Sequence, residues 1–381
     1  MEVREIIDRA QWDGFVSQAQ TGHLMQSYQW GELMKRDGQR IVRLGVLEDG
    51  QLIAAALVLV ATMPYVGTPW LYVLRGPVVD DPSSPALPAI IKELHQIARR
   101  ERAAMLKIEP NVEEGTPGWR ETLRTLGFQP NPIPAHVRRS WMLDIHPSEQ
   151  KLLAGMKRSW RYNIKVAERG GIQIHAATTP EEREAFYRIY QETSLRDDFT
   201  ILPLKHYTDI LELFGSDACL FLAEYEGQTL AGHLLIRYGT CCWDMFGATS
   251  EAHRNLKPGY LLHWKTFLWA KDQGCSLYDF RGIPEVLEPG EEMWNIYEYK
   301  RGFGGFSRLS LATHDYVYRP LIYWPVALAS RARVSLRRRQ RRQWELKRSQ
   351  RGEGSKQEGI KVEDNEKEGA PSQGGTAAHR G

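Results

Sequence analysis

Apolar residues at helical spacing predict two helices at the start of the chain. Residues 3–20 carry this pattern and predict one amphipathic helix. A second helix is predicted over residues 27–35, because Ser27 suits an N-cap and the apolar residues that follow share one face. Lys35 then lies at the C-terminal end of this helix, where a cation suits the dipole.

A strand–turn–strand pattern occurs twice. Residues 43–55 contain a strand, an acid-Gly-Gln turn and a second strand, and residues 219–232 repeat this order. The expected hairpin turns are residues 49–50 and 226–227.

An amphipathic helix and a returning strand follow each hairpin. Helix 86–102 precedes strand 105–109, and helix 260–272 precedes strand 277–280. The same three elements in the same order indicate an internal duplication. Each copy has the order of the acyl-CoA N-acyltransferase fold, so we expect an α+β protein with two tandem domains of that kind.

The glycine-rich turn that holds the pyrophosphate of coenzyme A in such enzymes is missing from the first copy. The second copy has only residues 254–260, which include Lys257. This segment is either a degenerate anion-binding turn at a helix N-terminus or an ordinary proline–glycine turn.

Composition and charge indicate a protein with two hydrophobic cores. The chain has 381 residues and a net charge of +3, too small for a polycation. Its four cysteines match no zinc pattern, so reduced thiols are expected. The longest apolar run, residues 52–63, is too short to span a bilayer. The N-terminus lacks the basic-then-apolar form of a signal peptide, and we expect a cytoplasmic protein.

Two stretches carry candidate chemistry. Residues 149–170 predict a basic helix, which is either a solvated face or a surface for an anionic partner. Residues 297–305 place Lys300 between aromatic residues and a glycine cluster, after a strand end and turn at 278–283. Lys300 could stabilise a bound or developing negative charge there. The alternative is a hairpin with a solvated lysine.

These features together resemble the Fem family of peptidoglycan interpeptide-bridge aminoacyltransferases. The resemblance rests on the two acyltransferase-like copies, Gln26-Ser27-x-x-Trp30-x-x-x-x-Lys35, the basic helix ending at 167–172, and Tyr299-Lys300-Arg301-Gly302-Phe303-Gly304-Gly305. It covers residues 1–325. Members of the family use aminoacyl-tRNA as donor and acylate an amino group of the stem peptide on a lipid-linked or nucleotide-linked muropeptide. The resemblance implies no cofactor and no metal.

The resemblance implies roles for individual residues. Lys35 matches a lysine that grips the diphosphate of the acceptor, and Glu109 falls where the family has an acid near the reacting amine. Tyr299 and Lys300 match an aromatic–lysine pair at the acyl-transfer centre. Further substrate-binding residues are expected at Trp30, Tyr28, Arg196, Phe246 and Arg281, and tRNA- or anion-binding residues at Arg158, Arg161, Lys165 and Lys257.

The physical chemistry of ester aminolysis agrees with these roles. The reaction needs a neutral amine and stabilisation of a tetrahedral oxyanion. Glu109 could orient or deprotonate the acceptor ammonium, and Lys300 could stabilise the oxyanion or the end of the tRNA. Phosphate contacts with a tRNA donor would give the basic helix a purpose.

The chain departs from the family pattern at one motif and lacks one long insertion. After residues 196–199 the family has a diphosphate-binding arginine, whereas this chain has Ile201-Leu202-Pro203. No long helical hairpin interrupts the second copy, so the shorter type without a coiled-coil arm is expected.

The C-terminal part combines aromatic residues with arginines. Residues 316–326 are aromatic and apolar, and residues 328–347 carry seven arginines. Contact of residues 317–347 with an anionic membrane, contact with tRNA, and a helix with a solvated basic end are the alternatives. Residues 352–381 have almost no large apolar side chains, and we expect them to be disordered.

The sequence therefore predicts a first domain over residues 1–146, to which residues 316–345 return, and a second domain over residues 147–315. The leading hypothesis is a monomeric, cytoplasmic aminoacyltransferase of cell-wall synthesis, with peripheral contact at the inner face of the plasma membrane as a further option. The alternatives are an acyl-CoA-dependent N-acyltransferase and a non-catalytic protein of the same fold that binds nucleic acid or a membrane surface.

Overall fold

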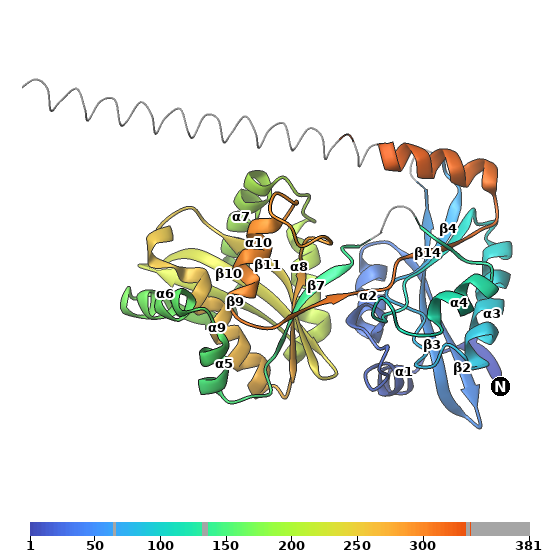
Figure 1. The fold of residues 1–381 in the computed structure, drawn as a ribbon, viewed down its shortest axis with the longest axis horizontal. Helices are drawn as coiled ribbons and strands as arrows, with labels where there is room; N and C mark the ends of the chain where they lie inside the picture. The colour runs from blue at the N-terminus through green and yellow to red at the C-terminus, as the bar shows by residue number, and fades with distance from the viewer. Residues whose placement is uncertain (64–65, 132–135, 333–335, 337–381) are drawn as a thin grey trace, which may run out of the picture. The chain divides into compact units, whose positions relative to one another are not determined.

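Two seven-stranded sheets form the framework of the chain (Figure 1). The computed structural model describes residues 1–63, 66–131, 136–332 and 336. The first sheet contains, in spatial order, β1 (Glu2–Glu5), β2 (Arg40–Glu48), β3 (Gln51–Thr62), β4 (Pro69–Val73), β5 (Met105–Ile108), β14 (His314–Val317) and β6 (Gln129–Pro130). The second contains β8 (Gln173–Ala176), β9 (Ala218–Tyr225), β10 (Gln228–Tyr238), β11 (Cys241–Thr249), β12 (Leu277–Gly282), β7 (Arg139–Asp144) and β13 (Phe306–Leu309).

Helices cover the faces of both sheets. In the first half they are α1 (Arg9–Val16), α2 (Tyr28–Arg36), α3 (Ala86–Arg100) and α4 (Trp119–Thr125). In the second half they are α5 (Glu149–Gly155), α6 (Arg158–Arg169), α7 (Pro180–Asp197), α8 (Leu204–Phe214), α9 (Pro258–Asp272) and α10 (Trp294–Arg301). α9 packs on β9 and β10, and α7 packs on β10 and β11.

The two sheets repeat one pattern of pairing. β4 and β5 are parallel, as are β11 and β12, and the other pairs in both sheets are antiparallel. The hairpin turns are equivalent too: Asp49 and Gly50 have φ values of 50° and 79°, and Glu226 and Gly227 have values of 49° and 75°. Positive φ at both central residues is the conformation that a two-residue hairpin requires. The prediction of two tandem acyltransferase-like domains in an α+β fold is confirmed.

Each sheet is completed by a strand from another part of the chain. β14 lies between β5 and β6 of the first sheet, although the whole second sheet precedes it in the sequence (Figure 1). β7 pairs with β12 and β13 of the second sheet. The boundary between residues 146 and 147 stays a prediction, and the pairing of β7 favours moving residues 139–146 into the second domain.

Two predicted helices differ from the observed elements. Residues 3–20 form strand β1 and then the shorter helix α1, whose N-cap Asp8 accepts a hydrogen bond from the Gln11 amide. Residues 149–170 form two helices, because the chain is extended at Met156 and Lys157. The Lys157 amide bonds the Gly302 carbonyl at 2.8 Å instead of continuing a helix.

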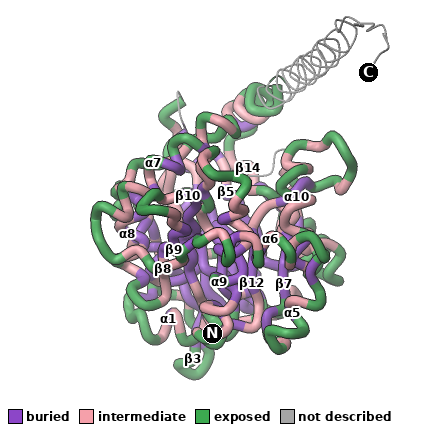
Figure 2. The backbone as a smooth tube through the Cα atoms, turned by 90° about the vertical axis from the view of Figure 1, so that its left-hand side faces the viewer, coloured by how far each residue is buried: buried purple, intermediate pink, exposed green. Residues whose placement is uncertain are grey.

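Three hydrophobic clusters form the core, and one of them joins the two halves. One lies between the first sheet and α3 and α4, and a second lies between the second sheet and α5, α6, α9 and α10. The third joins the halves, because it contains residues of α1 and α2 together with residues of α7 and α8. Figure 2 shows that buried residues concentrate in the strands, whereas exposed residues occupy the outlying turns and loops.

The C-terminal part is described only as far as residue 332 and at residue 336. Residues 320–332 are helical. The predicted disorder of 352–381 and most of the predicted basic surface of 317–347 lie outside the described residues. Within the described part of the chain, no helix has the length and apolar character needed to cross a membrane.

Candidate active site

Lys300 lies in the last turn of α10 and reaches the end of β12. Its Nζ donates a hydrogen bond to the carbonyl oxygen of Gly282 at 2.8 Å. Part of the side chain is exposed, but protein surrounds the ammonium. Burial lowers the pKa of Lys300 to about 8, although the charges of Asp244 and Asp279 act in the opposite direction. Lys300 is therefore not the solvated hairpin lysine of the alternative interpretation.

Tyr299 packs beneath this turn with its hydroxyl group directed into the second domain. The hydroxyl lies 3.1 Å from Nδ1 of His263. The ring packs edge-on against Tyr260 and Phe303, with centroids 5.2 and 5.3 Å away. These contacts fix the orientation of the turn that carries Lys300.

The glycines after α10 allow backbone conformations and close packing that a side chain would prevent. Gly304 and Gly305 have φ values of 88° and 98°, which residues with a side chain rarely adopt. A Cβ atom on Gly302 would lie 2.2 Å from the Trp160 ring, and one on Gly305 would lie 2.1 Å from the Met142 carbonyl oxygen. The close approach that this cluster permits is therefore to other parts of the chain.

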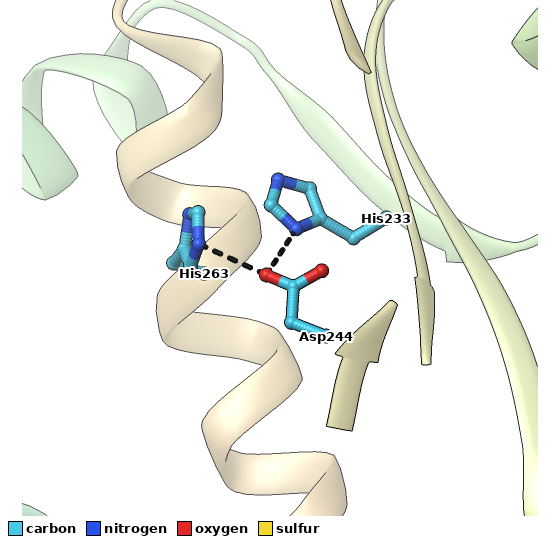
Figure 3. A group of neighbouring side chains, drawn as sticks. All are labelled: His233, Asp244 and His263. Carbon is cyan, nitrogen blue, oxygen red and sulfur yellow. Dashed lines mark hydrogen bonds and ion pairs between the residues drawn. The ribbon is translucent and has the colours of Figure 1, made fainter. Parts of the chain in front are cut away.

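A buried group of two histidines and an aspartate continues the network from Tyr299 (Figure 3). Asp244 Oδ2 lies 2.8 Å from Nδ1 of His233 and 3.3 Å from Nε2 of His263. Burial favours the neutral acid, yet the two histidines hold the pKa of Asp244 well below its usual range. Burial, together with the neighbouring His233, lowers the pKa of His263 to about 4. An ionised carboxylate thus faces a neutral imidazole at neutral pH.

The same group could hold a metal ion. Each residue offers one donor atom, and the three donor atoms lie within 4.8 Å of one another. Among the described residues, this is the set of histidine, cysteine and acidic side chains whose spacing suits a metal ion. The contacts to Asp244 Oδ2 also have the lengths of hydrogen bonds from two imidazoles. The sequence analysis missed all three residues, because they come from β10, β11 and α9 and share no local motif.

Glu109 is the second chemical centre, directly after β5. Its side chain is buried and accepts hydrogen bonds from Tyr72 at 2.6 Å and Thr313 at 2.7 Å, and His136 Nδ1 lies 2.9 Å from Oε2. Burial alone would raise the pKa of Glu109, but His136, the Arg75 charge and Tyr72 lower it to about 2. Glu109 is therefore a fixed carboxylate at neutral pH, suited to holding an ammonium and a weak base.

A short series of contacts joins the surroundings of the two centres. Gly282, which binds Lys300, leaves no room for a side chain, because a Cβ there would lie 3.0 Å from Cγ1 of Val137. The Val137 carbonyl accepts a hydrogen bond from Arg75 at 3.2 Å. Gly76 directly follows Arg75, and its carbonyl oxygen accepts a hydrogen bond from the Glu109 amide at 2.9 Å. This series of contacts links the surroundings of the two centres across the junction of the two halves.

Two family models match parts of the chain. Residues 7–117 match the FemAB family, and residues 154–301 match the acetyltransferase (GNAT) domain. The Lipid II:glycine glycyltransferase of Staphylococcus saprophyticus is 23% identical over 395 positions, which cover 85% of this chain and 94% of that protein. A protein of the same name from Staphylococcus aureus (strain MRSA252) is 22% identical and covers 83% and 93%. The predicted resemblance to the Fem family is confirmed.

Solved structures agree with this assignment at the level of the fold. The crystal structure of FemX matches with a TM-score of 0.79 at 21% identity, over 86% of this chain and all of that one (100%). The structure of L-PGS from Bacillus licheniformis matches with a TM-score of 0.53 at 15% identity, over 86% and 97%.

The predicted substrate-binding residues of the first half lie on α2. Among the described residues, their hydrogen bonds and ion pairs are with other residues of the first half and do not include Lys300 or Glu109. Lys35 pairs with Glu32 at 2.9 Å and is 46% exposed, so its ammonium can exchange this partner for a ligand. Trp30 is buried, and the Tyr28 ring carries the Arg43 guanidinium at 3.8 Å. These two aromatic residues have packing roles in the first domain, and ligand binding by them stays a prediction.

Arg196 and Phe246 lie elsewhere in the second half. Arg196 pairs with Asp197 and Glu251 at 3.1 and 2.9 Å. Phe246 packs against Tyr207, with ring centroids 5.0 Å apart. Arg281, by contrast, lies beside Gly282 and interacts with Lys300 through its charge. Of these three residues, Arg281 is the one that the structure brings to the Lys300 centre.

The predicted anion-binding residues divide into two groups. Arg158 and Lys165 are exposed on α6, as a phosphate-binding surface requires. Arg161 donates instead to the carbonyl oxygens of Leu153, Ala154 and Met156 at 2.8–3.2 Å, and so caps the end of α5. Lys257 precedes α9 in a left-handed conformation with a φ of 58°.

Proposed function

We propose that this chain transfers an amino acid from aminoacyl-tRNA to an amino group of a peptidoglycan-precursor stem peptide. The observation that carries the proposal is the pair of centres at the junction of two acyltransferase-like halves. One is the fixed carboxylate of Glu109, and the other is the Lys300 ammonium with its lowered pKa. The similarity to Lipid II:glycine glycyltransferases supports the same class of enzyme.

The residues divide the reaction between them. Glu109 holds and orients the acceptor ammonium, which loses a proton to solvent before attack, because a carboxylate with a pKa of about 2 is too weak to take it. The amine nitrogen then bonds to the ester carbonyl carbon, and Lys300 stabilises the oxyanion that forms. When the carbon–oxygen bond to the tRNA breaks, the nitrogen proton passes to the leaving hydroxyl group.

The donor binds, in this proposal, through the second half. Arg158 and Lys165 would contact phosphates, and contacts of this kind weaken as salt rises. The acceptor is lipid-linked or nucleotide-linked, with its diphosphate near Lys35. Contact of residues 317–347 with an anionic membrane is a separate part of the proposal. Charge reversal of Arg337, Arg338 and Arg339 should then weaken binding to anionic liposomes at low salt.

The proposal is tested by incubating the full chain with charged tRNA and a soluble muropeptide. Mass spectrometry should show the muropeptide gaining one aminoacyl residue. Acylation by acetyl-CoA without tRNA would favour the acyl-CoA alternative, which the GNAT domain match keeps in view. Binding of tRNA or muropeptide with no turnover of any ester would favour the non-catalytic alternative.

A further inference from the structure

Three arginines gather at the junction of the two halves, beside the proposed active site. Arg75 follows β4, Arg281 is in β12, and Arg308 is in β13. All three act on the buried ring of His23: burial lowers the pKa of that histidine, and the three positive charges lower it further. Three residues from different elements therefore surround one point.

Hydrogen bonds and strand pairing account for this convergence. Arg75 donates to the Val137 carbonyl at 3.2 Å, and Val137 packs on Gly282, next to Arg281. Gly282 and Arg308 are both in register with Ser140 of β7, which places them on strands to either side of it. Arg308 reaches from the second half to the Asn111 carbonyl of the first half, and Arg75 reaches from the first half to the Val137 carbonyl just before β7.

None of these guanidinium groups forms an ion pair among the described residues, although Arg75 acts on Glu109 and Asp279 acts on Arg281 through their charges. The hydrogen bonds of Arg75 and Arg308 go to the carbonyl oxygens of Val137 and Asn111, and no carboxylate oxygen in the described ranges lies within 4.0 Å of any of the three groups. Arg75 is only 8% exposed, and its Nε has no hydrogen-bond partner in that part of the chain. The undescribed residues 132–135, Pro-Ile-Pro-Ala, contain no acid.

Buried cations without a counter-ion are costly, and the cost falls when an anion binds. The arginine side chain favours anions with two oxygens in a plane, because its donors form a fork that matches a carboxylate. The distance from Glu109 is short, since the Glu109 amide bonds Gly76 directly after Arg75. The site therefore places a fixed carboxylate near three arginines that form no ion pair within 4.0 Å in the described part of the chain.

We propose that Arg75, Arg281 and Arg308 bind a carboxylate of the acceptor stem peptide. This inference rests on the proposed function. Glu109 holds the acceptor amine, and the arginines hold a carboxylate of the same peptide, so two points of opposite charge fix its position. A stem peptide offers such carboxylates on a diamino diacid residue, on its γ-linked glutamate and at its C-terminus.

The test compares soluble muropeptides in which each carboxylate in turn is replaced by a carboxamide. For the wild-type chain, amidation of the recognised carboxylate should raise KM about 10- to 100-fold, the range of a lost charged hydrogen bond. The three amidated peptides identify which carboxylate is bound. Arg75→Gln and Arg281→Gln should each raise KM for the free-carboxylate peptide and discriminate less between it and its amide.

Arg124→Gln is the matched control, since Arg124 is 76% exposed and pairs with Glu121 on α4. It should keep the wild-type preference. Direct binding of each muropeptide by calorimetry separates this inference from the proposed function, because it needs no turnover. Equal affinity of the wild-type chain for all four peptides would overturn the inference even if transfer occurs. A rise in KM for charged tRNA alone in the two variants would also overturn it, because the bound anion would then be a donor phosphate.

Discussion

Lys300 donates a hydrogen bond from Nζ to the backbone carbonyl of Gly282, 2.8 Å away. The bond ties the last turn of α10 to the end of β12, so two rigid elements fix the ammonium. An ammonium has three donors, and two remain for charge that develops on a substrate. Burial beside Arg281 lowers its pKa to about 8, which makes its charge sensitive to pH near neutrality.

The charged form of Lys300 should be the active one. We expect kcat to rise with pH below about 8, as the acceptor ammonium loses its proton to solvent, and to level off above about 8, because deprotonation of Lys300 removes the charge that stabilises the oxyanion. In Lys300→Arg this levelling should disappear, since guanidinium stays protonated, while the rate stays low because a planar fork does not reproduce the ammonium. Single-turnover rates between about pH 6.5 and 9.5, corrected for spontaneous hydrolysis of the donor ester, check this. A wild-type rate that keeps rising above about pH 8, as in Lys300→Arg, would contradict this role of the charged Lys300.

Glu109→Gln tests the role of the fixed carboxylate. Glutamine keeps the shape and the partners Tyr72 and Thr313 but removes the charge that holds the acceptor ammonium. We expect kcat/KM for the muropeptide to fall about 10- to 100-fold, with KM for charged tRNA unchanged. Steady-state kinetics with each substrate varied in turn give the answer. Wild-type kinetics for the acceptor would remove Glu109 from the site.

Tyr299 should act through its ring. Tyr299→Phe removes the contact with His263 and keeps the packing against Tyr260 and Phe303, so it should cost about 1 kcal/mol of stability and leave kcat nearly unchanged. Tyr299→Ala should lower both stability and kcat, because the turn carrying Lys300 loses its support. Thermal unfolding and kcat are measured for each variant. A large loss of kcat in Tyr299→Phe would point to a chemical role for the hydroxyl group.

Lys35→Met should affect binding and spare the chemical step. A diphosphate is bound equally in the ground and transition states, so the variant should raise KM for the acceptor with kcat unchanged. Lys205→Met is a suitable control, because Lys205 is also an exposed lysine in an ion pair on a helix, with Asp209. Equal KM values for wild type, Lys35→Met and Lys205→Met would show that the exposed pair of Lys35 and Glu32 is structural.

Local patterns predicted the repeated elements well, because those elements depend on nearby residues. The two hairpins were predictable from acid–glycine turns at residues 49–50 and 226–227, which both adopt positive φ. The cap of α2 by Ser27 was predictable for the same reason, and its side chain accepts the Trp30 amide at 3.1 Å.

Relationships between distant segments could not be predicted in this way. The pairing of β14 with β5 joins residues about 200 positions apart, as in the bond between Lys107 and Asp315 (|i−j| = 208). The group of His233, Asp244 and His263 forms only when two strands and a helix pack together. Arg161 looked like a tRNA-binding residue, because the sequence gave no sign of the break after α5 whose carbonyl groups it caps.

The most direct test is the single-turnover rate of Lys300→Met in transfer from charged tRNA to a soluble muropeptide. The variant must first be shown to be folded and to bind both substrates. We predict that kcat falls about 10²- to 10³-fold with little change in KM for the acceptor, as expected for the loss of one donor to a transition-state charge. Transfer at the wild-type rate would contradict the account and leave the hydrogen bond between Lys300 and Gly282 as a structural contact.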